Sequence, residues 1–401
     1  MPPIFVPMLA SLALLPAAMV RSTAVAASSN VAVAVSSKVG MAVRRRAVLT
    51  TAAGVALTLP TAAANAAADD AIYRPAPGSL VGTTVLITGA NTGLGLESAK
   101  RLAKAGANVV IAARTQAKAD GAIAKVSSGV ALAADQRLVG VSLDLADLSS
   151  VRTLPARLEA ALGAKDAPID VLLNNAGVMA IPERLETADG FEKTMGINHL
   201  GHFALVAALL PSLKRAANGF RVINVSSEAH RFASTDSIRQ ALDANLDPPY
   251  AAGGWGNYGL SKAANVLFTV ELQTRIEAAG LRGSAVSLHP GVVQTDLQRY
   301  IVGGVAAEDV RTSETAAPLT GVGKFLKEAL LDKVLLPVEV GANTQVYLAA
   351  AADAGGDRSK KPKLYFDNMK AVKPNEAAAD SALARQLWDV SEKLTGAKMQ
   401  F

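Results

Sequence analysis

The chain has 401 residues, with 40 Lys and Arg against 34 Asp and Glu and a formal charge of +6. That charge is uneven: residues 1–68 hold five basic residues and no acidic one, which leaves 35 basic against 34 acidic residues for 69–401. A nearly neutral body excludes the broad basic surface that nucleic-acid binding needs. The absence of cysteine excludes disulfides, thiolate catalysis and Cys-ligated metals.

Residues 1–68 are rich in small and apolar residues, which is typical of a targeting presequence rather than a folded domain. Met1–Val20 is apolar and is a candidate signal-peptide core. Arg44–Arg46 precede the apolar run Ala47–Leu59, and Ala64-Asn65-Ala66 offers a cleavage site. The arrangement resembles a twin-arginine export signal behind a plastid transit segment. We therefore expect a plastid (chloroplast) location, in the thylakoid lumen or at a membrane, with an uncleaved anchor as the alternative.

Residues 85–95 predict a strand, a tight turn and the start of a helix. The run Val85-Leu86-Ile87 is typical of a buried parallel strand. Glycines at 89, 93 and 95 remove side chains that would keep a pyrophosphate from the helix N-terminus, whose free N–H groups favour an anion. The stretch is a candidate dinucleotide site, although glycine also marks ordinary turns.

The same alternation of strand and helix continues along the chain. Further strands are predicted at 108–113, 137–143, 169–173, 221–225, 284–288 and 363–366, with helices between them and at 338–351 and 377–394. Such regularity predicts an α/β fold, a doubly wound parallel sheet with helices on both faces, in one domain over 69–401. Residues 297–335 lose this rhythm. We expect a substrate lid there, with a plain surface excursion or a membrane-touching helix as the alternatives.

Arg114 closes the second predicted strand, 25 residues after Gly89. An acidic residue near this point would bond the adenosine ribose 2′-hydroxyl, whereas a guanidinium can grip a 2′-phosphate with two parallel hydrogen bonds. The residue therefore favours NADP(H), with a solvated surface Arg as the alternative.

Tyr258 and Lys262 are four residues apart, so on a helix they share one face. An ammonium near the phenolic oxygen favours the ionised phenol and is expected to lower its pKa from about 10. A phenol tuned in this way can protonate a carbonyl oxygen, or take the proton from an alcohol in reverse. An incidental Tyr and Lys on a helix surface is the alternative.

Together these features resemble the short-chain dehydrogenase/reductase family. The resemblance rests on the Thr-Gly-x-x-x-Gly-x-Gly turn from Thr88, on Asn174-Asn175-Ala176-Gly177, and on Tyr258 and Lys262 with Ser227 at the family's usual interval before them. Within the family, the Asn-His-Leu-Gly-His-Phe run from Asn198 looks most like the branch of retinol dehydrogenases and WW-domain oxidoreductases, with protochlorophyllide reductases as relatives. The resemblance covers nearly all of residues 82–396.

The resemblance implies a Rossmann fold, an NADP(H) cofactor and four catalytic residues. Tyr258 would exchange the proton, Lys262 would tune it and bond the ribose, Ser227 would orient the carbonyl oxygen, and Asn198 would hold a water of the proton relay. The Pro-Gly turn would pass over the nicotinamide, and Thr295 would bond its carboxamide. The implied cofactor-binding residues are Gly89, Asn91, Thr92, Gly93, Leu94, Gly95, Arg114, Asp144, Leu145, Asn175, Ala176, Gly177, Tyr258, Lys262, Pro290, Gly291, Val293 and Thr295.

We therefore expect an NADP(H)-dependent oxidoreductase that interconverts a carbonyl and an alcohol on an apolar small molecule. Protochlorophyllide reductase is the first alternative, but that subfamily uses cysteine near its pigment and this chain has none. A non-catalytic module that senses NADP(H) and binds a partner is the second. No metal is expected, because His199 and His202 lack a third ligand at usable spacing. The sequence leaves open whether the protein forms a homodimer and whether it contacts a membrane surface.

Overall fold

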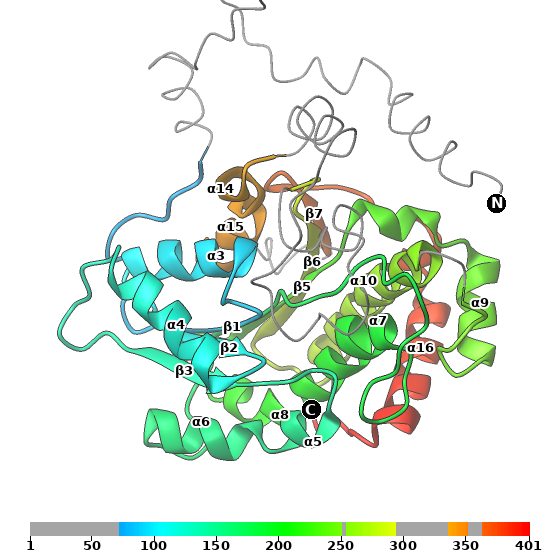
Figure 1. The fold of residues 1–401 in the computed structure, drawn as a ribbon, viewed down its shortest axis with the longest axis horizontal. Coiled ribbons are helices and arrows are strands. Elements are labelled where there is room, and N and C mark those ends of the chain that lie inside the picture. Colours follow the sequence, from blue (N-terminus) through cyan, green and yellow to red (C-terminus); the bar gives the residue numbers. More distant parts are fainter. Residues whose placement is uncertain (1–71, 251–253, 294–335, 352–362) are drawn as a thin grey trace, which may run out of the picture. The chain divides into compact units, whose positions relative to one another are not determined.

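The computed structural model describes residues 72–250, 254–293, 336–351 and 363–401. The predicted presequence, the whole of the predicted lid and Thr295 lie outside these residues. The described part is organised around one eight-stranded sheet with the strand order β3-β2-β1-β4-β5-β6-β7-β8 (Figure 1). The strands are β1 (Thr84–Thr88), β2 (Asn108–Ala113), β3 (Leu138–Ser142), β4 (Val171–Asn174), β5 (Phe220–Val225), β6 (Gly283–His289), β7 (Tyr365–Asp367) and β8 (Lys370–Ala371).

Every pair of neighbouring strands from β3 to β7 is parallel, and only β8 runs antiparallel to its neighbour β7. The chain moves outward from β1 to β3, then returns to place β4 on the other side of β1. This reversal defines a doubly wound α/β sheet, so the predicted Rossmann fold is confirmed. The short antiparallel β8 was not predicted, because a two-residue strand leaves no alternation to detect.

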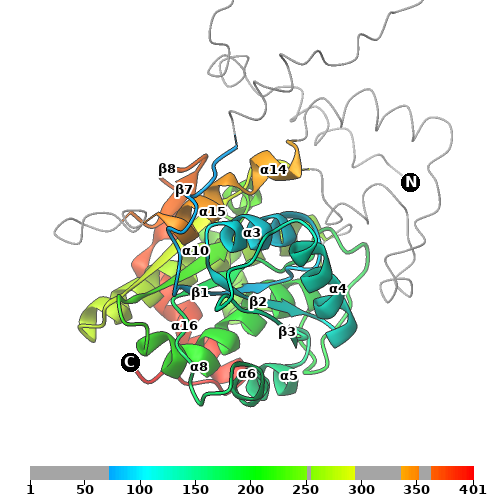
Figure 2. The same cartoon turned by 90° about the vertical axis from the view of Figure 1, so that its left-hand side faces the viewer.

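Helices cover both faces of the sheet, as Figures 1 and 2 show. One face carries α3, α4 and α15, and the other carries α5, α6, α8 and α10, with α16 packed on α10. The helices are α3 (Gly93–Lys104), α4 (Gln116–Ser127), α5 (Leu148–Arg152), α6 (Leu154–Leu162), α7 (Lys193–Met195), α8 (Gly201–Lys214), α9 (Thr235–Asp243), α10 (Trp255–Ala278), α14 (Val338–Gly341), α15 (Asn343–Ala350) and α16 (Ser381–Thr395). Shorter turns are η2 (Gly196–Leu200, a π-helix), η3 (Glu228–Phe232) and η7 (Ala377–Ala379).

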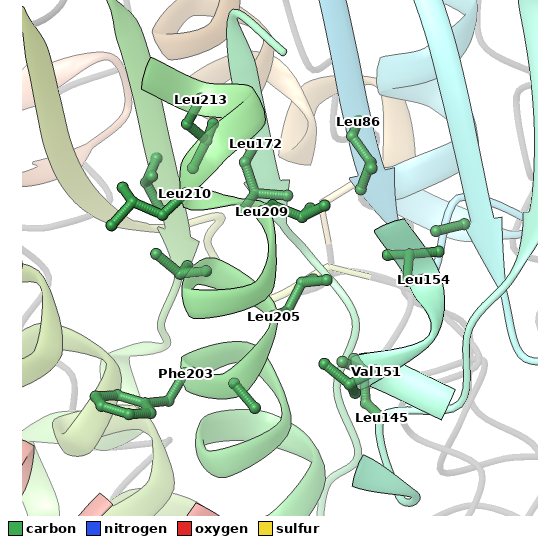
Figure 3. Packing of buried hydrophobic residues seen from close by; sticks show 14 of the residues in the cluster. Leu86, Leu145, Val151, Leu154, Leu172, Phe203, Leu205, Leu209, Leu210 and Leu213 are labelled. Carbon is green, nitrogen blue, oxygen red and sulfur yellow. The ribbon is translucent and has the colours of Figure 1, made fainter. Parts of the chain in front are cut away.

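Alternate strand residues supply two separate cores, because successive side chains in a strand point to opposite faces. Val85 and Ile87 face α3, while Leu86 between them faces α8. Figure 3 shows the second core, in which Leu86 and Leu172 from the sheet meet a row of side chains from α8. The fully buried Phe203 closes this row next to Trp388 of α16, with ring centroids 5.0 Å apart.

The segment Lys193–Lys214 is long and apolar enough to span a membrane by length and composition, and no other helix among the described residues is. Within it, 83% of the tested window is buried in the protein. Such burial is expected of a central core helix, and the segment runs through α7, η2 and α8 against the sheet.

Candidate active site

The glycine turn connects β1 to α3 and leaves the start of that helix open. Gly89 and Gly93 have φ angles of +64° and +53°, a region that residues with a Cβ rarely adopt. Thr92 precedes α3 in an extended conformation, its side chain caps no N–H group, and the first turn of α3 contains no acidic residue. The first N–H groups of α3 and the positive end of its dipole are thus available to an anion.

Thr88, to which the sequence analysis assigned no role beyond opening the glycine motif, joins the two loops of the cofactor site. Its Oγ1 accepts the backbone N–H groups of Asn175 and Ala176 at 3.0 and 2.9 Å, and lies 3.0 Å from Nε2 of His202. The side chain of Asn175 donates back to the Thr88 carbonyl at 2.8 Å. Because Nδ1 of His202 faces the Asn198 carbonyl, its Nε2 can accept the Thr88 proton, which is otherwise directed to the Leu173 carbonyl at 3.5 Å. The network fixes the turn after β1 to the turn after β4.

A cavity of about 210 Å³ runs along the carboxyl ends of β1 to β4. The predicted cofactor residues that line it are Gly89, Asn91, Thr92, Gly93, Leu94, Gly95, Arg114, Asp144, Leu145, Asn175, Ala176 and Gly177. Thr88, Ala112, Ala113, Lys118, Leu143, Val178 and Ile197 also line it. The lining combines basic residues, an uncapped helix N-terminus and several small residues, and this is the combination that a dinucleotide site at the carboxyl edge of a parallel sheet uses.

Two basic residues line the part of the cavity next to the end of β2, where a bound dinucleotide would place its adenosine ribose. Arg114 follows β2 and is exposed, and Lys118 lies one turn into α4. On the opposite wall, the Oδ1 of Asp144 accepts the N–H of Ala146 at 2.9 Å. Asp144 does not cap α5, because Asp147 does so by accepting the N–H of Ser149. Lys118 was missed because nothing in the sequence shows that α4 turns this side chain toward the cavity.

Ser227, Tyr258 and Lys262 come together at the carboxyl end of β5. Tyr258 is 3% exposed and its phenol is hydrogen bonded to the Ser227 side chain. The Nζ of Lys262 lies 5.7 Å from the centroid of the Tyr258 ring and donates to the Val225 carbonyl at 3.0 Å. A Cβ on Gly177 would lie 3.4 Å from Nζ, so the ammonium sits directly behind the inner end of the cavity.

The pKa of Tyr258 differs from the expectation. Burial raises the pKa of this phenol to about 12, and the hydrogen bond from Ser227 lowers it only in part. Burial also lowers the pKa of Lys262 to about 8. The expected lowering of the phenol pKa by the ammonium is therefore wrong for the protein without cofactor, because desolvation is the largest influence on each of the two buried groups.

Asn198 lies in the π-helical turn η2, a distortion that often marks functional sites. Its Oδ1 accepts the Val178 N–H at 2.8 Å, and its Nδ2 donates to the Val178 carbonyl at 2.9 Å and to Ser261 Oγ at 3.0 Å. A Cβ on Gly177 would lie 3.2 Å from Oδ1. The side chain thus joins the turn after β4 to α10, close to Lys262. Its water-holding role remains a prediction.

His199 and His202 point to different partners. The Nε2 of His199 lies 2.8 Å from Ser391 Oγ, whereas His202 contacts Thr88 and the Asn198 carbonyl. Both rings are fully buried, which lowers their pKa values to about 3 and about 4. Within the described ranges, no group of three His, Cys, Asp or Glu side chains is placed to hold a metal ion.

The Pro290-Gly291 turn follows β6, but it does not line the cavity described above. Gly291 has a φ angle of +82° and donates its N–H to Nδ1 of His289 at 3.0 Å. Val293 forms a parallel bridge with Leu336. Pro290, Gly291 and Val293 thus follow directly after β6 but do not line the cavity, so their contact with a cofactor stays a prediction. Thr295 lies beyond the described residues.

A small apolar cluster packs around Tyr258. Met179, Ala180 and Ala229 pack around Tyr258, and the Trp255 ring meets it edge-on at a centroid distance of 6.1 Å. These residues come from the turn after β4, from η3 and from the first turn of α10. The sequence did not identify them, because they are adjacent only in the folded chain.

Known proteins share this combination of sequence and fold. A family model described as short chain dehydrogenase matches residues 83–237. Retinol dehydrogenase 13 of Homo sapiens is 36% identical over 322 residues, which is 80% of this chain and 87% of that protein. WW domain-containing oxidoreductase of Pongo abelii is 36% identical over 317 residues, covering 78% and 68%. A solved structure of an uncharacterized protein from Mycobacterium paratuberculosis is 30% identical, with a TM-score of 0.56, and covers 82% of this chain and 100% of that one.

A doubly wound sheet with an open helix N-terminus at its carboxyl edge, beside a buried Tyr and Lys, defines a dinucleotide-binding oxidoreductase. At this level of identity and coverage, the chain belongs to the short chain dehydrogenase family. Its relatives place it in the branch of the retinol dehydrogenases and WW domain-containing oxidoreductases. It is therefore an oxidoreductase that acts on a carbonyl or an alcohol with a nicotinamide cofactor.

Proposed function

We propose that this protein interconverts an apolar carbonyl compound and its alcohol, with NADP(H) as the cofactor. The observation that carries the proposal is the environment of Tyr258. One side of the phenol bonds Ser227, and the other packs against Met179, Ala229 and Trp255. A substrate that reaches the phenolic proton must lie against this apolar cluster, which favours a hydrocarbon body next to the reacting oxygen.

Each side chain has a definite task in the reduction. The bound cofactor supplies the hydride to the carbonyl carbon. The Tyr258 phenol gives its proton to the carbonyl oxygen, so that the alcohol forms and the phenolate remains on the protein. Ser227 donates a hydrogen bond that orients the same oxygen. Lys262, held by the Val225 carbonyl, places a positive charge near the phenolate and stabilises it.

The preference for NADP(H) over NAD(H) is supported by Arg114 and Lys118. Both line the same end of the cavity, one after β2 and the other on α4. Two cations can share the charge of a 2′-phosphate, and the Arg can bond it with two parallel hydrogen bonds.

The raised pKa of Tyr258 supports the role of this phenol as the proton donor of the reduction. With a pKa of about 12, the phenol is protonated at pH 7 in the protein without cofactor. A protonated phenol is the form that reduction needs, whereas oxidation of an alcohol begins with the phenolate. The protein without cofactor therefore holds the phenol in the form that the reduction uses, while the direction of net turnover depends on the concentrations of the two cofactor forms, the substrate and the product.

The test is NADPH consumption by the full-length chain with a panel of apolar aldehydes and ketones, including retinal. Protochlorophyllide in the dark and in light forms a separate arm. NADH is compared with NADPH, and Tyr258→Phe is the control. NADPH-dependent turnover that disappears in the variant supports the proposal. Light-dependent turnover of the pigment alone would favour the protochlorophyllide reductase alternative, and tight NADPH binding without any turnover would favour a sensor.

A further inference from the structure

The turn that carries Ser227 also contains a buried histidine that the mechanism above does not use. His230 ends the run Ser-Ser-Glu-Ala-His after β5 and lies in η3, and its exposed fraction is 0%. A polar ring so completely buried is expected to have hydrogen-bond partners on both nitrogens. It has them, and they come from two distant parts of the chain.

The two nitrogens of His230 have opposite roles. Nδ1 lies 2.7 Å from the Ser227 carbonyl, which can only accept. Nε2 receives the backbone N–H of Asn375 at 3.0 Å, and that group can only donate. Together the two bonds fix one neutral tautomer, with the proton on Nδ1 and a lone pair on Nε2. The ring thus connects the catalytic serine to Asn375, which lies 145 positions after His230.

Asn375 is itself anchored at both ends of its side chain. Nδ2 donates to the Ala233 carbonyl at 2.8 Å, and Oδ1 accepts the N–H of Ala377 at 3.0 Å. The bridge therefore connects η3, just after Ser227, to the start of η7, which leads into α16. The position of the Ser227 backbone depends on where the C-terminal part of the chain packs.

The surroundings of His230 keep the ring neutral and fixed. The Tyr365 ring of β7 lies against it with centroids 4.9 Å apart, and its hydroxyl is 3.3 Å from Nδ1. Glu228 and Arg231 of η3 and His289 of β6 are the charged or titratable groups that act on it. Burial is the largest influence and lowers the pKa of His230, so the uncharged ring predominates at pH 7.

We propose that His230 is a positioning residue for the reaction: its neutral ring clamps the Ser227 carbonyl against Asn375, and so holds the serine hydroxyl at the Tyr258 phenol. This inference rests on the proposed function. A displacement of about 1 Å in such a group can cost on the order of 100-fold in rate. A clamp on the backbone of the serine prevents that displacement without contact to substrate or cofactor.

Two amide substitutions at His230 can remove its two side-chain bonds one at a time, the bond to the Ser227 carbonyl and the bond to the Asn375 N–H. In His230→Asn the amide nitrogen takes the place of Nδ1 and can still donate to the Ser227 carbonyl, but does not reach Asn375. In His230→Gln the amide reaches the place of Nε2 and can accept from Asn375, but the side-chain bond to Ser227 is lost, and the Ser227 carbonyl keeps only the backbone N–H of residue 230 at 3.0 Å. Both variants remove the same buried ring, so a purely structural role predicts equal damage.

We would measure kcat, KM, NADPH affinity and the unfolding temperature of the full-length variants. The expected result is a kcat at least about tenfold lower in His230→Gln and close to wild type in His230→Asn. NADPH affinity should stay near the wild-type value in both. Equal kcat in the two variants, or an unchanged kcat in His230→Gln, would overturn the proposal.

A second measurement does not need turnover. The whole sequence has four histidines, so histidine-labelled full-length protein gives a simple NMR spectrum in which His230→Gln assigns one signal. A neutral ring protonated on Nδ1 at pH 7 is expected. A ring protonated on Nε2 would overturn the clamp even if no carbonyl substrate is reduced, which separates its failure from that of the proposed function.

Discussion

The ammonium of Lys262 lies 5.7 Å from the centroid of the Tyr258 ring, on the same face of α10, and is held there by the Val225 carbonyl. Both groups are buried, and burial moves their pKa values toward the neutral forms. The spacing of four residues thus brings the two side chains together, but it does not by itself ionise the phenol. Before the cofactor binds, the phenol is a proton donor.

The pKa of Lys262 leads to a testable pH dependence of cofactor binding. Below a pH of about 8 this side chain is charged, and above it the ammonium loses its proton. NADPH affinity, measured by fluorescence titration between pH 6.5 and 9.5, should therefore weaken as the pH rises through about 8. Lys262→Arg stays charged over this range and should lose the pH dependence. Constant wild-type affinity across the range would contradict this assignment.

The two basic residues of the cavity should decide between the two cofactors. Arg114→Ala removes the paired charge-assisted hydrogen bonds of the guanidinium and Lys118→Ala removes that of the ammonium, so each should raise the KM for NADPH by about tenfold or more. The KM for NADH should change little. Lys125→Ala is the control, because this lysine lies in the last turn of the same helix, α4, and does not line the cavity. Equal losses with both cofactors would mean that neither residue meets the 2′-phosphate.

Gly95 should not tolerate even one methyl group. A Cβ there would lie 2.6 Å from Nδ2 of Asn175 and 2.7 Å from the Gly89 carbonyl oxygen. Gly95→Ala should therefore lower the free energy of unfolding by about 1–3 kcal/mol and abolish tight NADPH binding. Gly121→Ala is the matched control, since a Cβ at this helical position has no heavy atom within 4 Å. The control should be neutral or more stable by up to about 1 kcal/mol. Denaturant unfolding of both variants measures the two changes, and equal stability of Gly95→Ala and Gly121→Ala would contradict the prediction.

The buried histidines predict a loss of stability in acid. His199 and His202 have pKa values of about 3 and about 4 in the folded protein, against 6.5 for an ordinary histidine. Between these limits the unfolded chain binds more protons than the folded one, so the free energy of unfolding falls as the pH drops from about 6.5 toward 4. Urea unfolding at several pH values measures the slope. His199→Phe should make the slope shallower, and an unchanged slope would contradict the assignment.

Local patterns were sufficient to predict much of the site. Glycines at 89, 93 and 95, the Asn-Ala-Gly turn and the four-residue spacing of Tyr258 and Lys262 are each set within one turn or helix. Backbone freedom and helix geometry act over such short distances, so the sequence carries them directly. Strand and helix alternation likewise predicted the doubly wound sheet, because a parallel sheet needs a crossover between successive strands.

The tertiary structure decided what depends on distant partners or on burial. Thr88 joins two turns 87 residues apart, and His230 reaches Asn375 across 145 residues. Neither pairing has a sequence pattern, because hydrogen bonds between distant segments leave no fixed spacing. The direction of the pKa shift of Tyr258 was also decided by the tertiary structure. The sequence determined that a cation stands near the phenol, but only the packed interior determined how much water each group loses, and desolvation proved the larger effect.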